Sequence, residues 1–439
     1  YSSRFGLDYQ ADMILRDATI HNYLIPLEYL GGYLAYKEGQ SVLDFIVKKY
    51  GPEKISEILN KGKVNLSIDK ALKADIGVDQ KELSEEWMKT LKKRYWPELA
   101  KREEPKDFAK QLTFHEKDNS FLNEKPAFSP QGDRIAIFSD RSDYTEIYII
   151  SSIDGKMIDR VVKGERSGDL EALHSYISGL SWSKDGEKLT FVSKSKGQDA
   201  LCLLDVKKKK VYKKFKFDLN SMLSPTWSPD QQKIVFVGVK DGRPDLYLYN
   251  LNEKSLTKIT DDFYSELDPV WSPDGSSLAF ASDRPLNSDS VSLKNYQPGH
   301  YNLFTWETNT NQVKVLLGGY DNSRMPSWSP DGKKICFVSN KNGIDNMYLH
   351  DLDSLTTYAI TNVLSGCFNP SWSPDGEKIA FSCFYKGGWD IFIINEILPK
   401  TKAGEELEPT EFVLDIRNGA KTQDSLKASE STLSLTSEK

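Results

Sequence analysis

Side chains that could carry out hydrolysis are sparse in this chain. A catalytic zinc site needs two imidazoles about one helical turn apart, as on an H-E-x-x-H helix. No such pair occurs among the histidines, which stand far apart in the sequence. They are His21, His115, His174, His300 and His350. We therefore predict that this chain holds no metal ion and that its histidines lie on the surface or in loops.

A serine nucleophile is not indicated either. The G-x-S-x-G elbow places its serine on a strained strand-to-helix turn, whereas the nearest match, residues 179–183, reads Gly-Leu-Ser-Trp-Ser. No glycine-rich loop for a phosphate is present, and carboxylate pairs such as Asp261-Asp262 are better explained by turns. We expect no catalytic residues and no cofactor, so binding is the class of function to examine.

One phrase organises most of the chain. Its last copy reads S-W-S-P-D-G-E-K-I-A-F from Ser371, then a short polar loop, then G-W-D-I-F-I-I-N to Asn395. Its anchoring aromatic recurs about every 45 residues, which is the spacing of propeller blades. The anchors are Phe128, Trp182, Trp227, Trp271, Trp328 and Trp372. The sequence therefore repeats one supersecondary unit six times.

Each copy predicts a hairpin corner followed by a buried strand. In Ser-Pro-Asp-Gly, proline presets φ, aspartate bonds back to the backbone, and glycine accepts the left-handed geometry. The next strand is apolar at alternating positions and mostly apolar between them, so both of its faces require burial. A third strand carries an aromatic in every copy except the second, where Cys202 stands. Sheets stacked around an axis would bury both faces.

The phrase P-x-W-S-P-D-G-x-x-I-A-F, followed by D-I-Y and L-T, resembles the WD40-like PD40 repeat of the TolB-type propellers. It departs from that pattern at Gln131, Lys184 and Gln231. We expect a mainly β fold, a six-bladed β-propeller of four-stranded antiparallel blades over residues 106–399, preceded by a small all-α domain. The resemblance implies a protein-binding module of the bacterial cell envelope, located in the periplasm or associated with the envelope.

Closure of the ring needs one more strand, because the sixth copy has only three strands by Asn395. Residues 110–113, K-Q-L-T, resemble the ends of the fourth strands in other copies. We predict that they complete blade six, with residues 411–416, E-F-V-L-D-I, as the rival strand. Residues 400–439 are predicted to be a disordered or linker tail, since the end of the chain is rich in Ser, Thr and Lys.

Residues 1–105 have helical periodicity, with Gly51-Pro52 and Gly77 as stops and Asp79 as a cap. The stretches A-D-M-I-L-R-D-A, Y-K-E-G-Q-S-V-L-D-F-I-V-K-K-Y-G-P-E-K-I and L-S-E-E-W-M-K-T-L-K-K-R-Y-W-P resemble the helical C-terminal part of peptidase-MA-like gluzincin metallopeptidases. In that family the zinc ligands and the catalytic glutamate lie upstream of this part. The resemblance implies that the chain begins at Tyr1 just past such a site, as a fragment or processed product.

Charge and hydropathy indicate which classes of partner the chain can bind. The 439 residues carry a net charge of -6 and a pI near 5.6, which gives no general attraction to nucleic acid or anionic lipid. No apolar run approaches the roughly 20 residues of a membrane-spanning helix. We expect a monomer that binds a protein or peptide. Cys367 and Cys383 are predicted to lie nearly opposite each other as buried thiols, with a bridge as the alternative.

Strand parity predicts which loops share a face. In a four-stranded blade, the loop after strand two and the connection to the next blade lie opposite the Ser-Pro-Asp-Gly turns. The two longest gaps between anchors carry their extra residues in such segments, Glu165–Ser178 and Arg284–His300. We call this side the insertion face. Loops held by a rigid scaffold tend to carry binding residues, so we predict that the insertion face binds the partner.

Candidate contact residues fall into three groups on the insertion face. Connections that feed the inner strands are expected to place Asp268, Arg324 and Asn369 near the axis. Farther out we expect Arg166, Glu171, Arg284, Tyr296 and Tyr144. Tyr385 and Trp389 flank a Lys-Gly-Gly loop, and Tyr, Trp and Arg are the residues most enriched at binding hot spots. The alternative for Trp389 is that it only covers the sheet edge.

Two hypotheses follow from these patterns. In the first, the chain is a non-catalytic interaction module that binds protein or peptide at the cell envelope. In the second, it is a fragment of a zinc metallopeptidase whose catalytic motif lies upstream, and the propeller gates or recruits substrate. An H-E-x-x-H helix encoded just ahead of Tyr1 would favour the second hypothesis.

Overall fold

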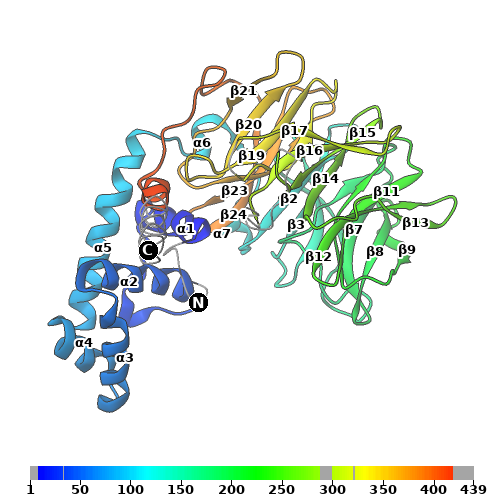
Figure 1. The fold of residues 1–439 in the computed structure, drawn as a ribbon. Helices are drawn as coiled ribbons and strands as arrows, with labels where there is room; N and C mark the ends of the chain where they lie inside the picture. Colours follow the sequence, from blue (N-terminus) through cyan, green and yellow to red (C-terminus); the bar gives the residue numbers. More distant parts are fainter. Residues whose placement is uncertain (1–7, 33, 287–298, 320–321, 419–439) are drawn as a thin grey trace, which may run out of the picture. The chain divides into compact units, whose positions relative to one another are not determined.

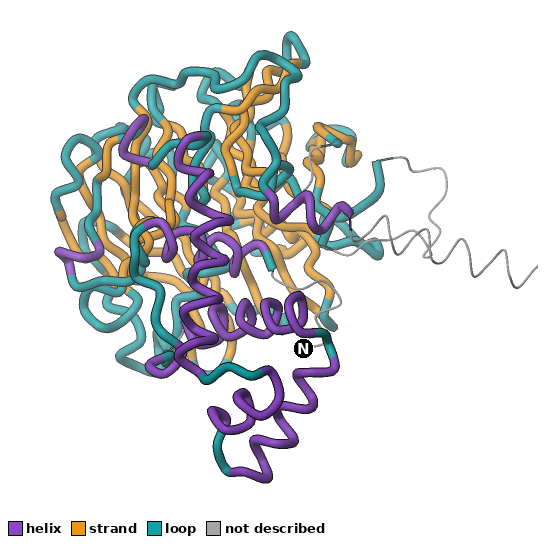
Figure 2. Tube along the Cα trace, turned by 90° about the vertical axis from the view of Figure 1, so that its left-hand side faces the viewer, coloured by secondary structure: helices purple, strands orange, loops and turns teal. Residues whose placement is uncertain are grey.

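The computed structural model describes residues 8–32, 34–286, 299–319 and 322–418. The chain divides into two compact units. The helical unit contains the residues up to 102 together with 342–344 and those from 408 onward, and the propeller unit contains residues 103–341 and 345–407. The long helices lie in the first unit and the strands in the second; Figure 2 draws helices in purple and strands in orange.

The helical unit contains five α-helices before residue 96, which confirms the expected N-terminal all-α part. They are α1 (Tyr9–Ile20), α2 (Leu34–Tyr50), α3 (Glu53–Asn65), α4 (Ile68–Ile76) and α5 (Gln80–Tyr95), with short 3-10 turns at Leu27–Tyr29 and Trp96–Ala100. Helix α5 begins with the predicted cap, because the Asp79 carboxylate accepts the Glu82 N–H at 2.9 Å and Glu82 accepts the Asp79 N–H at 2.9 Å. Helix α4 ends at Gly77, whose φ is 80°.

Residues 411–418 also form a helix, in place of the rival strand and of the tail predicted from residue 400. Phe412 is buried in the core of the helical unit, and its ring meets Tyr9 edge-on at 5.1 Å. An apolar run this short fits either a strand or a buried helix by its pattern alone. The burial of Phe412 among side chains of the α-helices favours the helical form of residues 411–418.

The propeller unit has six four-stranded antiparallel sheets, as the repeat predicted (Figure 1). Blades one to three are β2 (Asn123–Phe128), β3 (Arg134–Ser139), β4 (Glu146–Ser151), β5 (Met157–Val162); β6 (Ser181–Trp182), β7 (Lys188–Ser195), β8 (Gln198–Asp205), β9 (Lys210–Phe215); and β10 (Ser221–Trp227), β11 (Lys233–Lys240), β12 (Arg243–Asn250), β13 (Ser255–Lys258). The first strand named in each blade is the inner strand.

Blades four to six have the same order. They are β14 (Glu266–Trp271), β15 (Ser277–Ser282), β16 (Asn302–Glu307), β17 (Gln312–Leu317); β18 (Arg324–Trp328), β19 (Lys334–Ser339), β20 (Asn346–Asp351), β21 (Thr356–Ala359); and β22 (Cys367–Trp372), β23 (Ile379–Tyr385), β24 (Gly388–Ile394), completed by β1 (Lys110–Gln111). Short helices α6 (Pro105–Phe108) and α7 (His115–Asp118) flank β1.

The predicted closing strand is confirmed. Strand β1 pairs antiparallel with β24, with Lys110 opposite Ile393 and Gln111 opposite Phe392. The chain thus begins and ends its ring in one sheet, and the Leu112 N–H extends the pairing to the Ile391 carbonyl at 2.8 Å. Cys367 and Cys383 are register partners in β22 and β23, where both are buried.

Aromatic pairs fill the blades and anchors join neighbouring blades. The ring of Phe381 on β23 stacks on Phe392 of β24 at 5.9 Å, and equivalent pairs occur in blades three, four and five. The Trp372 indole N–H donates to the Ser327 carbonyl of blade five at 3.2 Å, and Trp182 donates to Ala127 of blade one at 2.9 Å. The repeat therefore supplies aromatic residues to the blade cores, and in blades two and six its tryptophan also bonds the preceding blade.

Candidate functional site

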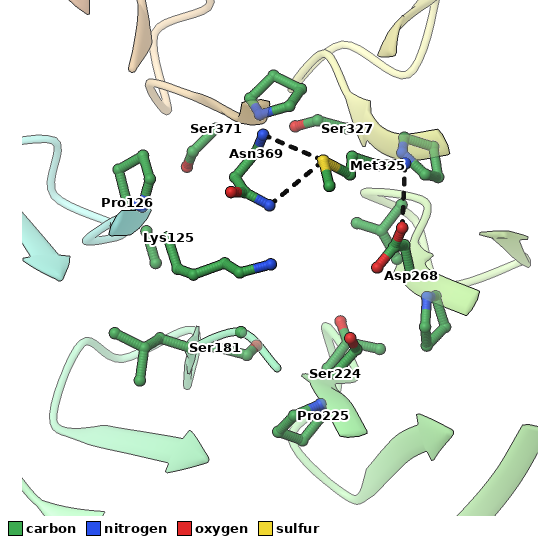
Figure 3. A pocket seen from close by; sticks show the side chains of 18 residues that line it. Lys125, Pro126, Ser181, Ser224, Pro225, Asp268, Met325, Ser327, Asn369 and Ser371 are labelled. Atoms are coloured by element: carbon green, nitrogen blue, oxygen red, sulfur yellow. Dashed lines mark hydrogen bonds between the residues drawn. The ribbon is translucent and has the colours of Figure 1, made fainter. Parts of the chain in front are cut away.

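A cavity of about 220 Å³ lies where the six inner strands converge (Figure 3). Each blade contributes three consecutive residues at equivalent positions, namely 125–127, 179–181, 224–226, 268–270, 325–327 and 369–371. Each triplet stands directly before the anchoring aromatic of its blade, so it lies within the inner strand in every blade except the second, where β6 begins only at Ser181. We call this space the axial cavity.

β-Bulges aim side chains into the axial cavity. In every blade except the second, the first residue of the triplet precedes a proline and has a left-handed φ, and the pairing with the neighbouring strand shifts register there. These residues are Lys125, Ser224, Asp268, Met325 and Asn369. A bulge redirects a side chain, and proline at the bulge sacrifices no ladder donor. Left-handed geometry costs each non-glycine residue on the order of 1 kcal/mol, and such strain tends to cluster at functional sites.

Hydrogen bonds from one blade to the preceding one hold the bulges in place. The Asp268 Oδ2 atom accepts the Met325 N–H at 3.2 Å, and the Met325 Sδ atom accepts both N–H groups of Asn369 at 3.4 Å (Figure 3). The Lys125 N–H donates to Ser382 Oγ at 3.0 Å, and the Ser224 N–H to Ser178 Oγ at 3.0 Å. The wall of the axial cavity is therefore preorganised by contacts between blades.

Lys125 is one of the cavity residues that the sequence interpretation missed. Its side chain is 9 % exposed and reaches into the axial cavity (Figure 3). Burial lowers the pKa of Lys125, the charges of Asp268 and Glu124 oppose that shift, and Arg324 adds to it, so the net shift is downward. The signal was present in the sequence, because Lys125-Pro126 aligns with Asp268-Pro269.

Two of the three residues predicted near the axis line the axial cavity, and the third does not. Asp268 and Asn369 line the axial cavity as expected. Arg324 does not, because Met325 is the residue in register with them. The Arg324 guanidinium pairs instead with Asp345 at 3.2 Å.

Arg166, Tyr144 and Glu171 lie on insertion-face loops. The Arg166 guanidinium sits over the Tyr144 ring at 4.6 Å and pairs with Glu146 at 3.3 Å. Glu171 accepts the Gly197 N–H at 3.2 Å. Arg166 and Glu171 therefore brace loops, whereas the Tyr144 side chain is 42 % exposed and offers contact area.

The other outer residues are engaged within the propeller or fall outside the described part. The Arg284 guanidinium pairs with Glu266 at 2.6 Å and with Asp262 at 3.0 Å, and its side chain is only 11 % exposed. Tyr385 is buried and donates its hydroxyl to Glu104 at 3.0 Å. Trp389 packs edge-on against Phe368 and Phe384 at 5.2 and 5.4 Å. Tyr296 lies outside the described residues.

Exposed apolar side chains mark the insertion face near the cavity. Tyr176 and Ile177, on the connection that enters blade two, are 69 % and 55 % exposed. The Ile177 carbonyl accepts the Ser224 hydroxyl at 3.4 Å, and Ser178 accepts the Ser224 N–H, so this pair stands beside the cavity wall. Phe263, on the connection that enters blade four, is also exposed. The sequence interpretation placed the insertion Glu165–Ser178 on the correct inter-blade connection, but it did not single out Tyr176 and Ile177 within it.

Within the described ranges, no cluster of three or more His, Cys, Asp or Glu side chains has the arrangement of a metal site. Across the same ranges, every helix is too short or too polar to cross a lipid bilayer.

Comparison with known proteins gives one family match and several similar folds. The family described as TolB beta propeller domain matches residues 162–316 and 290–403. TolB from Acinetobacter baumannii is 18 % identical over 75 % of this chain and 72 % of its own, with a TM-score of 0.44. The putative TolB from Agrobacterium tumefaciens is 19 % identical over 62 % and 90 %, with a TM-score of 0.45. Oligogalacturonate lyase from Vibrio parahaemolyticus is 14 % identical over 65 % and 92 %, with a TM-score of 0.42. No curated protein sequence matches the chain.

Proposed function

This chain belongs to the TolB β-propeller domain family, and from that membership we propose that it is a non-catalytic module that binds a protein or peptide on its insertion face. The observation that carries the proposal is the exposed pair Tyr176 and Ile177 beside the axial cavity. Large apolar side chains over a preformed concavity are typical of binding hot spots. We place this activity in the periplasm or at the cell envelope of a bacterium.

The charged groups of the insertion face support binding over catalysis. Arg284 is committed to Glu266, and the His174 imidazole lies 2.8 Å from an Asp199 carboxylate oxygen. The Asp199 carboxylate also accepts the Met222 N–H at 2.9 Å, which ties blade two to blade three. Side chains engaged in this way hold loops and strands of the propeller in place.

We expect the double variant Tyr176→Ala with Ile177→Ala to lose most partner binding, by roughly tenfold or more, because hot-spot side chains dominate interface energy. The measurement is capture from bacterial envelope extract by the immobilised chain, quantified by mass spectrometry. Ile153→Ala with Leu355→Ala is the matched control, since both side chains are exposed on turns of the opposite face. Equal capture by wild type and the insertion-face variant, or no specific capture by wild type, would contradict the proposal.

A second proposal concerns the helical unit and keeps the metallopeptidase hypothesis. Two of the stretches that resemble the gluzincin helices meet in its core, where the Tyr95 hydroxyl donates to Asp12 at 2.8 Å and Arg16 pairs with Asp12 at 2.6 Å. Under this proposal the chain supports a zinc site formed by residues outside it, and the propeller recruits substrate. Genomic sequence encoding an H-E-x-x-H helix ahead of Tyr1 would decide for it. Zinc held by this chain's own side chains, with peptide turnover, would contradict both proposals.

A further inference from the structure

Lys125 combines two unfavourable features at one residue. Its backbone has a φ of 57° although it is not glycine, and the residue, which carries an ammonium group, is only 9 % exposed. Left-handed geometry is strained for a residue with a side chain, and a buried charge is costly unless it is paired. Strain concentrated at a concave site points to a ligand.

The charges around the axial cavity leave the Lys125 ammonium without a close counter-ion. Among the described residues, no carboxylate makes an ion pair with it. Asp268 and Glu124 act on it from farther away, and one oxygen of Asp268 already accepts the Met325 N–H. Arg324 is paired with Asp345. A negatively charged ligand would complete this arrangement, whereas the ammonium group would repel a metal ion.

The size and chemistry of the cavity favour one end of a peptide over a bulky anion. About 220 Å³ accommodates a residue or two, not a folded surface. Hydroxyl and amide groups of Ser181, Ser224 and Asn369 border the space (Figure 3). A peptide carries N–H donors next to its carboxylate, and the carboxylate of Asp268 can accept from them.

We propose that the axial cavity binds a carboxylate group of a peptide that enters from the insertion face, with the Lys125 ammonium as its counter-charge. The carboxylate is either the C-terminus or an Asp or Glu side chain. This inference rests on the proposed function, because it names the chemical group that the propeller recognises. Tyr176 and Ile177 then contact the part of the peptide that remains outside the cavity.

The Met325 methyl group provides a local reporter, since its thioether lines the cavity. The chain has six methionines, so carbon-13-labelled methyl resonances are few, and Met325→Leu assigns the one of interest. Three probes are titrated into the full chain: acetyl-Gly-Ser-Gly with a free C-terminus, the same peptide as a C-terminal amide, and acetyl-Gly-Asp-Gly amide. The exposed Met157 on β5 serves as an internal reference.

We expect at least one carboxylate probe to shift the Met325 resonance saturably, with a dissociation constant on the order of 1 mM for so small a ligand. The probe without a carboxylate should leave it unmoved. Lys125→Gln should weaken binding roughly tenfold or more, because it removes a buried charge partner. Lys254→Gln is the matched control, being an exposed lysine with a φ of 56° on an opposite-face turn, and it should bind as wild type does. The two carboxylate probes distinguish a C-terminus from an acidic side chain.

Equal shifts from the acid and the amide in the wild-type chain would overturn the inference without any variant, so misfolding of Lys125→Gln cannot obscure the result. Unchanged affinity in a folded Lys125→Gln variant would also overturn it. If capture of a partner depends on Tyr176 and Ile177 but no probe shifts the Met325 resonance, the result supports the proposed function and contradicts the carboxylate site. If the resonance responds as expected but no partner is captured, the site stands and the proposed function falls.

Discussion

Replacing Asp390 with alanine is expected to lower the free energy of unfolding of the propeller by about 3–5 kcal/mol. The Asp390 carboxylate is fully buried and accepts hydrogen bonds from the Gln111 amide at 3.0 Å, the Thr113 hydroxyl at 2.8 Å and the His115 N–H at 2.9 Å. It also bonds the His115 imidazole at 2.7 Å and the Asn123 amide at 3.3 Å. These donors lie on the closing segment and on blade one, so alanine leaves buried donors unpaired where the two ends of the ring meet.

The measurement is urea-induced unfolding followed by tryptophan fluorescence. Asp353→Ala is the control, because Asp353 is an exposed aspartate on a turn of blade five, and surface changes of this kind usually stay within about 0.5 kcal/mol. A loss below about 1 kcal/mol for Asp390→Ala would show that the ring closes without this carboxylate.

The hydrogen-bonded pair of Asp390 and His115 makes the stability of the ring closure depend on pH. Burial lowers the pKa of His115, but the hydrogen bond to Asp390 and its charge raise it more, so the net shift is upward. A histidine whose pKa is raised on folding stabilises the protein fully below its unfolded pKa, near 6.5. That contribution disappears as the pH rises through the folded pKa. Asp390→Ala should therefore cost most at mildly acidic pH and less at alkaline pH.

The number of blades and the closing strand were predictable because each copy of the repeat carries its own complete signal. The anchoring aromatic, the Ser-Pro-Asp-Gly corner and the doubly apolar strand specify one sheet without reference to distant residues. The segment from Lys110 could be matched because fourth strands end in a similar phrase, and its pairing with β24 follows from the need to close the ring.

The candidate site was predictable only in part, because its details depend on tertiary geometry. The connections that feed the inner strands were expected to bring Asp268 and Asn369 near the axis, and both residues line the axial cavity. The left-handed bulges were not foreseeable, since a non-glycine residue before proline normally prefers an extended conformation. Arg324 was expected near the axis in error, because Met325 is the residue that stands three positions before its anchoring aromatic, as Asp268 and Asn369 do.

Residue type alone also overstated the binding role of some side chains. Arginine is enriched at binding hot spots, but Arg284 pairs with Glu266. Glu266 lies on β14, which is paired with the strand that Arg284 follows. Tyr385 bonds Glu104, which is remote in sequence. Such pairings depend on which segments meet in space, and a single sequence does not reveal them. The buried lysine was missed for the converse reason, since lysine is rarely expected inside a protein.

Replacing Trp87 with alanine is expected to lower the free energy of unfolding of the helical unit by about 3–5 kcal/mol, as is usual for a buried tryptophan. Trp87 is 1 % exposed, and its indole N–H donates to the Ser41 hydroxyl at 3.0 Å, which links α5 to α2. Alanine would leave a large cavity and an unpaired hydroxyl in a small core. Because the long helices of the described chain all lie in this unit, urea unfolding followed by circular dichroism at helical wavelengths reports on it directly.

Trp96→Ala separates the effect of burial from that of losing a tryptophan. Trp96 is 50 % exposed in the turn that follows α5, where the Lys92 ammonium lies 5.6 Å from its ring. Its removal forfeits one exposed cation–π contact, worth about 0.5–1 kcal/mol. If the two variants lost similar stability, the helical unit would be held together by local helix propensity and not by a common core. A much larger loss for Trp87→Ala would establish the core as its source of stability, because only that side chain joins two helices distant in sequence.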